Sequence, residues 1–162
     1  MKNNEKPSIC SICKGKCCQS ASGYTIPTDF QEETTLHFLI SLLESGNWSI
    51  DWLEGDPRYS IRDGEPKLNR CYALRVARVN DTGVFTKSFG GACVLWSLEK
   101  GCSLPFENRP IECRFLKPIR SMSCKSNGKY SKEYCAKRWI PYQDMLIEAG
   151  HRIEKSRTHS PS

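Results

Sequence analysis

Four of the ten cysteines in this 162-residue chain lie within nine residues, in the segment Cys10-Ser-Ile-Cys13-Lys-Gly-Lys-Cys17-Cys18. A Cys-x2-Cys pair is a natural chelate, because its turn points both thiolates the same way and lets backbone N–H groups donate to sulfur. The neighbours Cys17 and Cys18 can scarcely form an unstrained disulfide with each other, but their side chains can point to two different places. Thiolates at this density predict a soft metal ion or an iron–sulfur cluster.

The other six cysteines are single and widely spaced, with no second Cys-x2-Cys loop and no histidine beside them. They are Cys71, Cys93, Cys102, Cys113, Cys124 and Cys135. Structural zinc sites commonly join two chelating loops, whereas three cysteines from one loop and a distant fourth are a common iron–sulfur arrangement. The pattern therefore favours an iron–sulfur cluster, of the 4Fe-4S type, and leaves zinc as the alternative.

Ten cysteines would fit disulfides in a secreted protein and metal ligation in the reducing cytosol. No apolar h-region follows the polar residues 1–9, so we expect no signal peptide. The longest apolar run, residues 38–43, is interrupted by Ser41 and is far too short to span a membrane. We therefore expect a cytoplasmic protein with no membrane partner, whose cysteines are thiols or ligands.

The formal net charge of +6 is unevenly spread, with −1 on residues 1–113 and +7 on residues 114–162. A basic C-terminal third can meet nucleic acid or another anion. It can also balance a thiolate centre, because four thiolates around Zn²⁺ or a 2+ cluster leave a charge of about −2. We favour this compensation, together with a solvated basic tail, over a nucleic-acid partner. The sequence identifies no protein partner.

The expected fold class is α+β, in one small, irregular, cysteine-rich domain over residues 1–150 and a flexible basic tail over residues 151–162. Few helices and a short β-hairpin are expected, organised around a metal centre. Only 38% of the residues are hydrophobic, which is thin for a self-sufficient core and favours a metal staple.

Several elements have local signals of their own. Thr28 is predicted to cap a helix whose apolar stripe runs to Leu43, with Gly46 as its stop. Residues 47–70 are predicted to be a connecting segment with aromatic anchors. Residues 71–79 and 84–86 are predicted to form a hairpin around the turn-forming residues 80–83.

Two helices are predicted near the C-terminus. Ser131 is expected to cap a helix through Cys135 to Trp139, and Pro141 to begin a second helix that ends at Gly150. A helix start is also expected at Asn108-Arg109-Pro110, directly before Cys113.

A set of short motifs resembles the YkgJ-type cysteine-cluster family, the putative zinc- or iron-chelating CxxCxxCC domain. The motifs are Cys10-x2-Cys13-x3-Cys17-Cys18, Gly91-Ala-Cys93, Gly101-Cys102-Ser-Leu and Arg109-Pro110-Ile-Glu-Cys113-Arg114. The resemblance covers about residues 10–118. One departure is the spacing before the Cys-Cys pair, which is two residues in the family and three here, Lys14-Gly15-Lys16.

The resemblance implies a bacterial protein of uncharacterised activity that binds iron or zinc. A related cysteine cluster occurs in flagellin lysine N-methylase, where it is associated with iron–sulfur-dependent methyl transfer. The family motif maps onto seven cysteines of this chain as metal ligands. They are Cys10, Cys13, Cys17, Cys18, Cys93, Cys102 and Cys113. Cys124 and Cys135 lie outside the firm motif as possible further ligands, and Cys71 is interpreted as a small buried hydrophobic residue.

Seven or eight thiolates exceed one four-coordinate site. The hypothesis is one principal site made of Cys10, Cys13, one member of the Cys17–Cys18 pair and Cys113. A second site would take Cys102, Cys93 and Cys124, unless those thiols serve redox chemistry. Arg109 and Arg114, which flank Cys113, are interpreted either as donors that compensate thiolate charge or as ordinary surface arginines.

Two functions from different classes remain open. The first is a metal-binding protein whose cysteines hold an iron–sulfur cluster, related to redox chemistry or methyl transfer. The alternative is a zinc-stapled, non-catalytic binding module that uses its basic C-terminal third. Whether the protein is an enzyme is left open, because the sequence supplies neither a substrate pocket nor a catalytic base.

Overall fold

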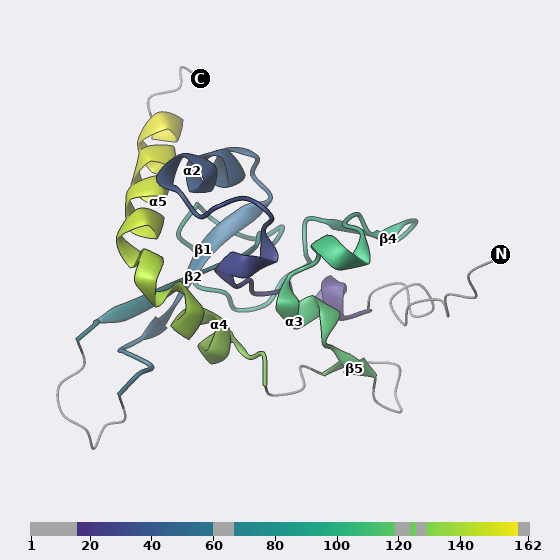
Figure 1. The fold of residues 1–162 in the computed structure, drawn as a ribbon. Helices are drawn as coiled ribbons and strands as arrows, with labels where there is room; N and C mark the ends of the chain where they lie inside the picture. The colour runs from purple at the N-terminus through teal and green to yellow at the C-terminus, as the bar shows by residue number, and fades with distance from the viewer. Residues whose placement is uncertain (1–15, 60–66, 119–123, 126–128, 159–162) are drawn as a thin grey trace.

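The structure is a computed structural model that describes residues 16–59, 67–118, 124–125 and 129–158 (Figure 1). Its helices are α2 (Leu36–Glu44), α3 (Ile111–Arg114), α4 (Lys132–Trp139) and α5 (Gln143–Thr158). The strands are β1 (Trp48–Glu54), β2 (Arg70–Val76), β3 (Trp96–Ser97), β4 (Gly101–Cys102), β5 (Lys117–Pro118) and β6 (Cys124–Lys125). Short 3-10 helices are η1 (Lys16–Gln19), η2 (Pro27–Asp29), η3 (Phe106–Asn108) and η4 (Ile140–Tyr142). The described residues thus form the few helices and small antiparallel sheets of an α+β fold.

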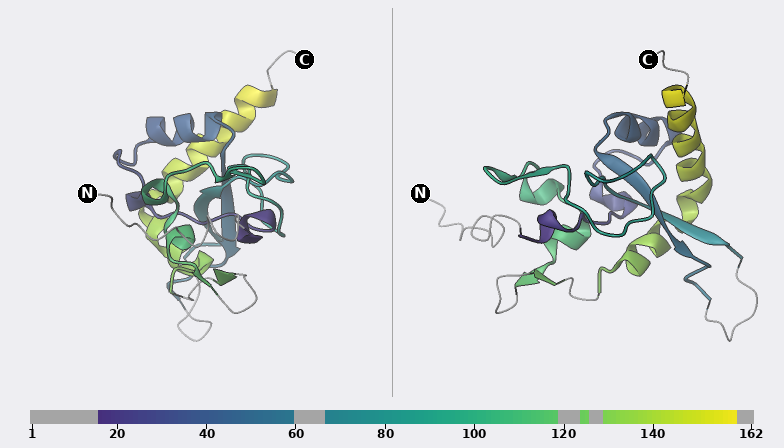
Figure 2. Two further views of the ribbon diagram at one scale, coloured as in Figure 1. Left: turned by 90° about the vertical axis from the view of Figure 1, so that its right-hand side faces the viewer. Right: turned by 180° about the vertical axis from the view of Figure 1, so that it is seen from behind.

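The antiparallel pair β1–β2 is the centre of the molecule. Its register runs from Trp48 opposite Val76 to Glu54 opposite Arg70. In Figure 1 and in the right-hand view of Figure 2, this pair lies between α5 and the part of the chain that carries α3 and β3–β4. Helices α4 and α5 pack on the pair, and α2 packs against α5. The sheet therefore joins a helical side to a cysteine-rich side.

The expected hairpin between residues 71–79 and 84–86 is wrong, and so is the reading of residues 47–70 as mere connection. β2 pairs with β1 instead, and residues 84–86 lie parallel to the other edge of β1. The backbone N–H of Ile50 donates to the carbonyl of Val84 at 2.7 Å. Strand β1 needs hydrogen-bond partners on both edges, because its buried backbone groups cannot bond to water. β2 and residues 84–86 supply these partners from distant parts of the sequence, which no short-range pattern predicts.

Helix α2 begins later than the sequence predicts. Thr35, and not Thr28, is its N-cap, with a hydroxyl that accepts from the N–H of Phe38 at 3.1 Å. The carboxylate of Asp29 is engaged elsewhere, because it accepts from the N–H groups of Ile26 and Ile111. Gly46 follows the helix at φ 79°, as the expected stop requires.

For the two C-terminal helices, the sequence predicted the start of α4 correctly but not the end of α5. Ser131 caps α4 by accepting from the N–H of Tyr134 at 3.2 Å, as predicted. Helix α5, however, does not end at Gly150 but continues to Thr158, so residues 151–158 are not a flexible tail. Gly150 is a packing position, because a Cβ there would overlap the ring of Phe85. One turn further on, Ile153 is buried in the core and anchors the extension.

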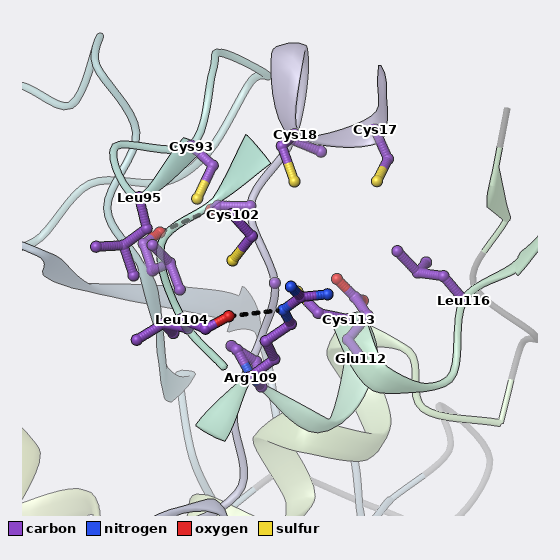
Figure 3. Close-up of a pocket in the computed structure, with 15 residues that line it drawn as sticks. Cys17, Cys18, Cys93, Leu95, Cys102, Leu104, Arg109, Glu112, Cys113 and Leu116 are labelled. Atoms are coloured by element: carbon purple, nitrogen blue, oxygen red, sulfur yellow. Dashed lines mark hydrogen bonds between the residues drawn. The ribbon is translucent and has the colours of Figure 1, made fainter. Parts of the chain in front are cut away.

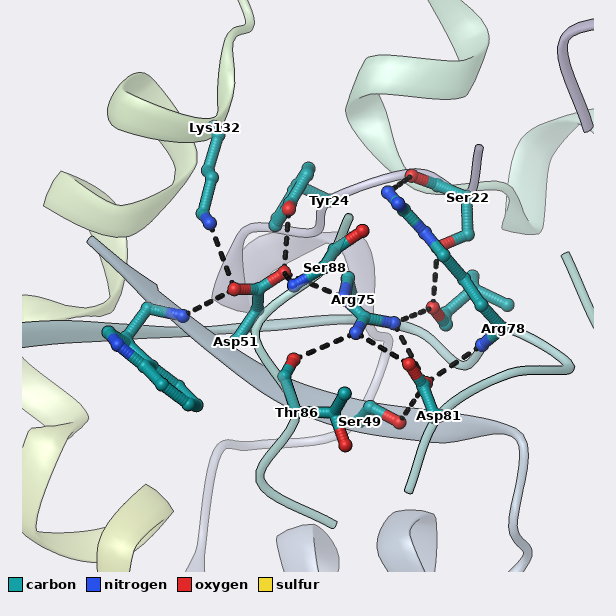
Figure 4. A network of polar contacts seen from close by, with 12 residues as sticks. Ser22, Tyr24, Ser49, Asp51, Arg75, Arg78, Asp81, Thr86, Ser88 and Lys132 are labelled. Carbon is teal, nitrogen blue, oxygen red and sulfur yellow. Dashed lines mark hydrogen bonds and ion pairs between the residues drawn. The ribbon is translucent and has the colours of Figure 1, made fainter. Parts of the chain in front are cut away.

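A buried ion network crosses the β1–β2 pair (Figure 4). The side chain of Arg75 on β2 is 0% exposed and donates to Asp51 at 2.8 Å and to Asp81 at 2.9 Å. Asp51 also accepts from the hydroxyl of Tyr24 at 2.7 Å and from the ammonium of Lys132 at 2.8 Å. The network thereby ties the N-terminal segment, both strands, the following loop and α4 to one cation.

Opposing effects set the pKa values of the two carboxyl groups. Burial raises the pKa of Asp51, but hydrogen bonds from Lys132, Tyr24 and Arg75 outweigh it and hold the pKa below its ordinary value. Burial also raises the pKa of Asp81, and the hydrogen bonds from Arg75, the backbone N–H of Arg78 and other donors again lower it overall. Both groups are therefore charged at neutral pH.

Replacing Arg75 by Leu should destabilise the fold strongly, because two buried carboxylates would lose their shared cation. The expected loss in the free energy of unfolding is about 3–5 kcal/mol. Urea denaturation followed by tryptophan fluorescence measures it. Arg70→Leu, at the exposed end of the same strand, is the matched control and should leave the midpoint almost unchanged. Equal effects of the two substitutions would contradict the role given to the buried network.

The same network predicts how stability depends on pH. Because the folded pKa of Asp81 lies below its ordinary value of 3.8, its contribution is complete above that value and is lost as the pH falls through the folded pKa. The advantage of the natural protein over Asp81→Asn should therefore be constant near neutrality and shrink below about pH 4. Urea midpoints of both proteins across this range measure it. A difference that grows on acidification would contradict the expectation.

Candidate metal centre

Five cysteines from four separate places in the sequence line one cavity of about 210 Å³ (Figure 3). They are Cys17, Cys18, Cys93, Cys102 and Cys113. Figure 3 shows the sulfur atoms of Cys17, Cys18, Cys93 and Cys102 directed toward the same space. Apolar side chains, including Leu95, Leu104 and Leu116, and the charged residues Arg109 and Glu112 complete the lining. The fold thus gathers the described members of the sequence-predicted ligand set.

The Cys17–Cys18 pair is held by the short helix η1 and by a backbone bond to a distant segment. The N–H of Ala21 donates to the carbonyl of Cys17 at 3.0 Å, which closes the turn of η1. The N–H of Cys93 donates to the carbonyl of Cys18 at 2.8 Å. Main-chain contact therefore fixes the first cysteine segment against the second.

Cys93 precedes the small hairpin β3–β4, and Cys102 is the last residue of its second strand. The N–H of Trp96 donates to the carbonyl of Cys93 at 3.2 Å, and Trp96 is paired with Cys102 across the hairpin. Cys93 also bridges to Arg78, just beyond β2. Gly101, at φ 69°, supplies the left-handed backbone that brings the chain back into β4. The central sheet is thus connected to the wall of the cavity.

Cys113 is positioned by residues outside its own short helix. Asp29 accepts from the N–H of Ile111 at 2.9 Å, at the start of α3, and from the guanidinium of Arg114 at 2.7 Å. The sulfur of Cys113 rests against Gly23, where an added Cβ would overlap it. The carboxylate Asp29 and the missing side chain of Gly23 together determine where this thiol lies.

Burial and mutual proximity raise the pKa values of three cavity thiols, Cys18, Cys93 and Cys113. For Cys113 the causes are burial, then the neighbouring Glu112 and the thiols of Cys93 and Cys102. A hydrogen bond with Cys17 raises the pKa of Cys18, with burial adding to it, and burial raises the pKa of Cys93. These three thiols are therefore protonated at neutral pH without a ligand.

Arg109 and Arg114 take different roles, although they flank the same cysteine. Arg109 lines the cavity and donates through Nε to the carbonyl of Leu104 at 3.0 Å. Its Nη1 is buried and has no hydrogen-bond acceptor among the residues that the structure describes. Arg114 donates to Asp29 instead, and its Nε is likewise buried with no acceptor among the described residues. Of these two arginines, Arg109 is the one that lines the cavity and so places an unsatisfied cationic donor beside the thiols.

Glu112 is a site residue that the sequence argument did not single out. Its carboxyl lines the cavity, where burial raises its pKa to about 7 despite a hydrogen bond from the backbone N–H of Tyr24. Gly23 and Asp29, which position Cys113, were missed as well. The only signal for Glu112 was its place next to Cys113, and Gly23 and Asp29 act across more than 80 residues of sequence, where no local pattern reaches.

Two cysteines lie in the core and not in the cavity. Cys71 is 0% exposed and its thiol donates to the carbonyl of Ala136 at 3.4 Å, which confirms its interpretation as a small buried residue. Cys135 is likewise fully buried in the hydrophobic core. Burial raises the pKa of Cys71 to about 11 and that of Cys135 to about 12. Neither thiol lines the site, so Cys135 is not a ligand of this cavity.

The remaining predicted ligands, Cys10, Cys13 and the side chain of Cys124, lie outside the described residues. No disulfide joins any two cysteines that the structure describes. Within that part of the chain, no three His, Cys, Asp or Glu side chains are arranged closely enough to hold a single metal ion. The described thiols thus surround a cavity and do not form a compact four-sulfur coordination site.

The comparisons with known proteins give no relative for this chain. No family model, no curated protein and no solved structure matches it. Among the described residues, no helix is long and apolar enough to cross a membrane.

Replacing Gly23 by Ala should displace Cys113, because the new Cβ would occupy the space of its sulfur. We expect the native-state reaction of the cavity thiols with a thiol reagent to change in rate. Gly83→Ala, where an added Cβ meets nothing within 4 Å, is the matched control and should react like the natural protein. Quantitative labelling with peptide mapping identifies the thiols affected. An unchanged rate for Cys113 would contradict this packing.

Proposed function

We propose that this protein binds an iron–sulfur cluster in the cysteine-lined cavity. The observation that carries the proposal is the convergence of five cysteines from separate parts of the chain. Pairwise backbone contacts hold residues 17–18 against Cys93, and side-chain contacts place Cys113 beside Gly23. Gathering so many thiols around one cavity serves no evident packing purpose, whereas it is what a thiolate-held cluster needs.

The electrostatics of the cavity agree with a cationic cluster core. The thiols of Cys18, Cys93 and Cys113 are unfavourable to ionise on their own, as their raised pKa values indicate. A bound cation reverses this preference, because it stabilises the deprotonated sulfur and drives proton release. An apolar lining would then shield the cluster from water and tune its potential.

The positive charge of Arg109 also supports an iron–sulfur cluster in this cavity. A cluster with four thiolate ligands carries a net negative charge, and a buried cationic donor without an acceptor fits beside it. In this position Arg109 would donate to a ligand or cluster sulfur. This use agrees with the first of the two interpretations of Arg109 that the sequence left open.

The size of the cavity favours a cluster over one zinc ion. Zinc draws each sulfur to about 2.3 Å, so its ligands lie close together. The described thiols have no such arrangement and surround a volume of about 210 Å³. A multi-atom cluster, of the 4Fe-4S type, spreads its ligands further apart and suits this geometry better.

We propose a single centre in place of two. Cys113, predicted for the principal site, shares its cavity with Cys93 and Cys102, predicted for the second. The described candidates for ligation are therefore Cys113, Cys93, Cys102 and one member of the Cys17–Cys18 pair, with Cys10 and Cys13 as further candidates from the sequence. The proposal is in keeping with the resemblance to the YkgJ-type family. A redox role in the cytoplasm is the function that such a centre supplies most directly.

Anaerobic purification tests this proposal. We expect brown protein with visible absorption, iron and acid-labile sulfide. Cys113→Ser should lose most of the iron and sulfide, because it removes a ligand and leaves a poorer one. Cys71→Ala is the matched control: it also removes one thiol, but one that lies in the core, and it should retain the natural content.

Two results would overturn the proposal. The first is colourless protein with stoichiometric zinc from anaerobic cells supplied with iron, which would instead favour the zinc-stapled module. The second is an equal iron content in Cys113→Ser and the natural protein. Because overexpression can load the wrong metal, the zinc result counts only under anaerobic, iron-replete conditions.

A further inference from the structure

A row of three aromatic rings joins the end of α3 to the start of α4. The ring centroids of Phe115 and Tyr130 are 4.7 Å apart, and those of Tyr130 and Tyr134 are 5.2 Å apart. Phe115 is 45% exposed, although rings of this size are usually buried. Packing alone therefore does not account for the outer end of the row.

Each ring of the row has a cation over it. Arg114 lies 6.0 Å from the centroid of Phe115, Lys129 lies 5.3 Å from that of Tyr130, and Arg138 lies 5.0 Å from that of Tyr134. Arg138 is exposed and also donates to the hydroxyl of Tyr134 at 3.1 Å. Rings and cations thus alternate along one surface.

The cations over the rings give the row a positive charge. Arg114 also pairs with Asp29 at 2.7 Å, whereas the side chains of Lys129 and Arg138 are exposed. The described end of the row therefore presents positive charge that an anionic phosphate backbone can contact.

We infer that this row binds single-stranded nucleic acid. Unpaired bases stack on aromatic rings and on guanidinium planes, while neighbouring cations contact the phosphates. The exposed ring of Phe115 and the cations over Tyr130 and Tyr134 offer both interactions along one row. A lipid surface would use the cations but supplies no bases to stack on the rings, and a duplex keeps its bases stacked inside. This inference does not rest on the proposed cluster.

Fluorescence anisotropy with a labelled oligothymidylate and a labelled oligouridylate of about twelve nucleotides tests the inference. Phe115→Ala and Arg138→Gln should each weaken binding by at least about fivefold, because each removes a stacking surface. Arg138→Gln should also flatten the dependence on salt, by about 0.7 in the slope of log K against log [salt] if the side chain meets a phosphate.

The matched controls change the same residue types elsewhere. Phe89→Ala removes a ring that is 91% exposed in the loop after β2, and Arg152→Gln removes an exposed cation on α5. Both should bind within about twofold of the natural protein. Urea unfolding of all four variants verifies that each remains folded, which is expected because every substituted side chain is partly or largely exposed.

Three outcomes would overturn the inference. One is no measurable binding of either oligonucleotide at low salt. Another is equal loss of affinity in Phe89→Ala and Phe115→Ala, which would remove any special role of the row. The third is equally tight binding of heparin, duplex DNA or phosphatidylserine vesicles with no effect of Phe115→Ala, which would make this a general polyanion surface.

Discussion

A guanidinium group that is completely withdrawn from water is costly unless every donor is matched, and Arg75 meets that condition inside the β1–β2 pair. Its partners come from both strands and from the loop after β2. Tyr24, which also contacts Asp51, leads directly back to the segment that carries Gly23 and η1. The walls of the cysteine cavity therefore depend on a buried ion network whose charged groups do not line the cavity themselves.

Local rules predicted those parts of the fold that are determined locally. Ser131 caps α4 because its hydroxyl needs only the following turn, and Gly46 stops α2 for a similar reason. The pairing of β1 with β2 escaped prediction, since Trp48 and Val76 are brought together by core packing and by the buried ion network. Gly150 was taken for a helix stop because glycine ends helices, whereas here it permits close contact with Phe85.

The sequence predicted which cysteines belong to the candidate site, but it did not predict how the fold arranges them or which other residues surround them. The motifs that resemble the YkgJ-type family selected Cys93, Cys102 and Cys113, and the cavity brings these together. The motifs could not identify Glu112 as a site residue, because its environment exists only after folding, or Asp29, whose carboxylate acts on a helix more than 80 residues away. The same limit applies to Cys135, which belongs to the core although its sequence spacing resembles that of the lining cysteines.

The backbone bond between Cys18 and Cys93 has a consequence for the order of events during synthesis. Cys17 and Cys18 cannot meet Cys113 until the 95 residues that follow Cys18 have been synthesised, and contacts of such long sequence separation form slowly. Until then these thiols are exposed to oxidants and to adventitious metals. A complete set of cavity thiols is therefore available to a ligand only after the segment that carries Cys113 has left the ribosome.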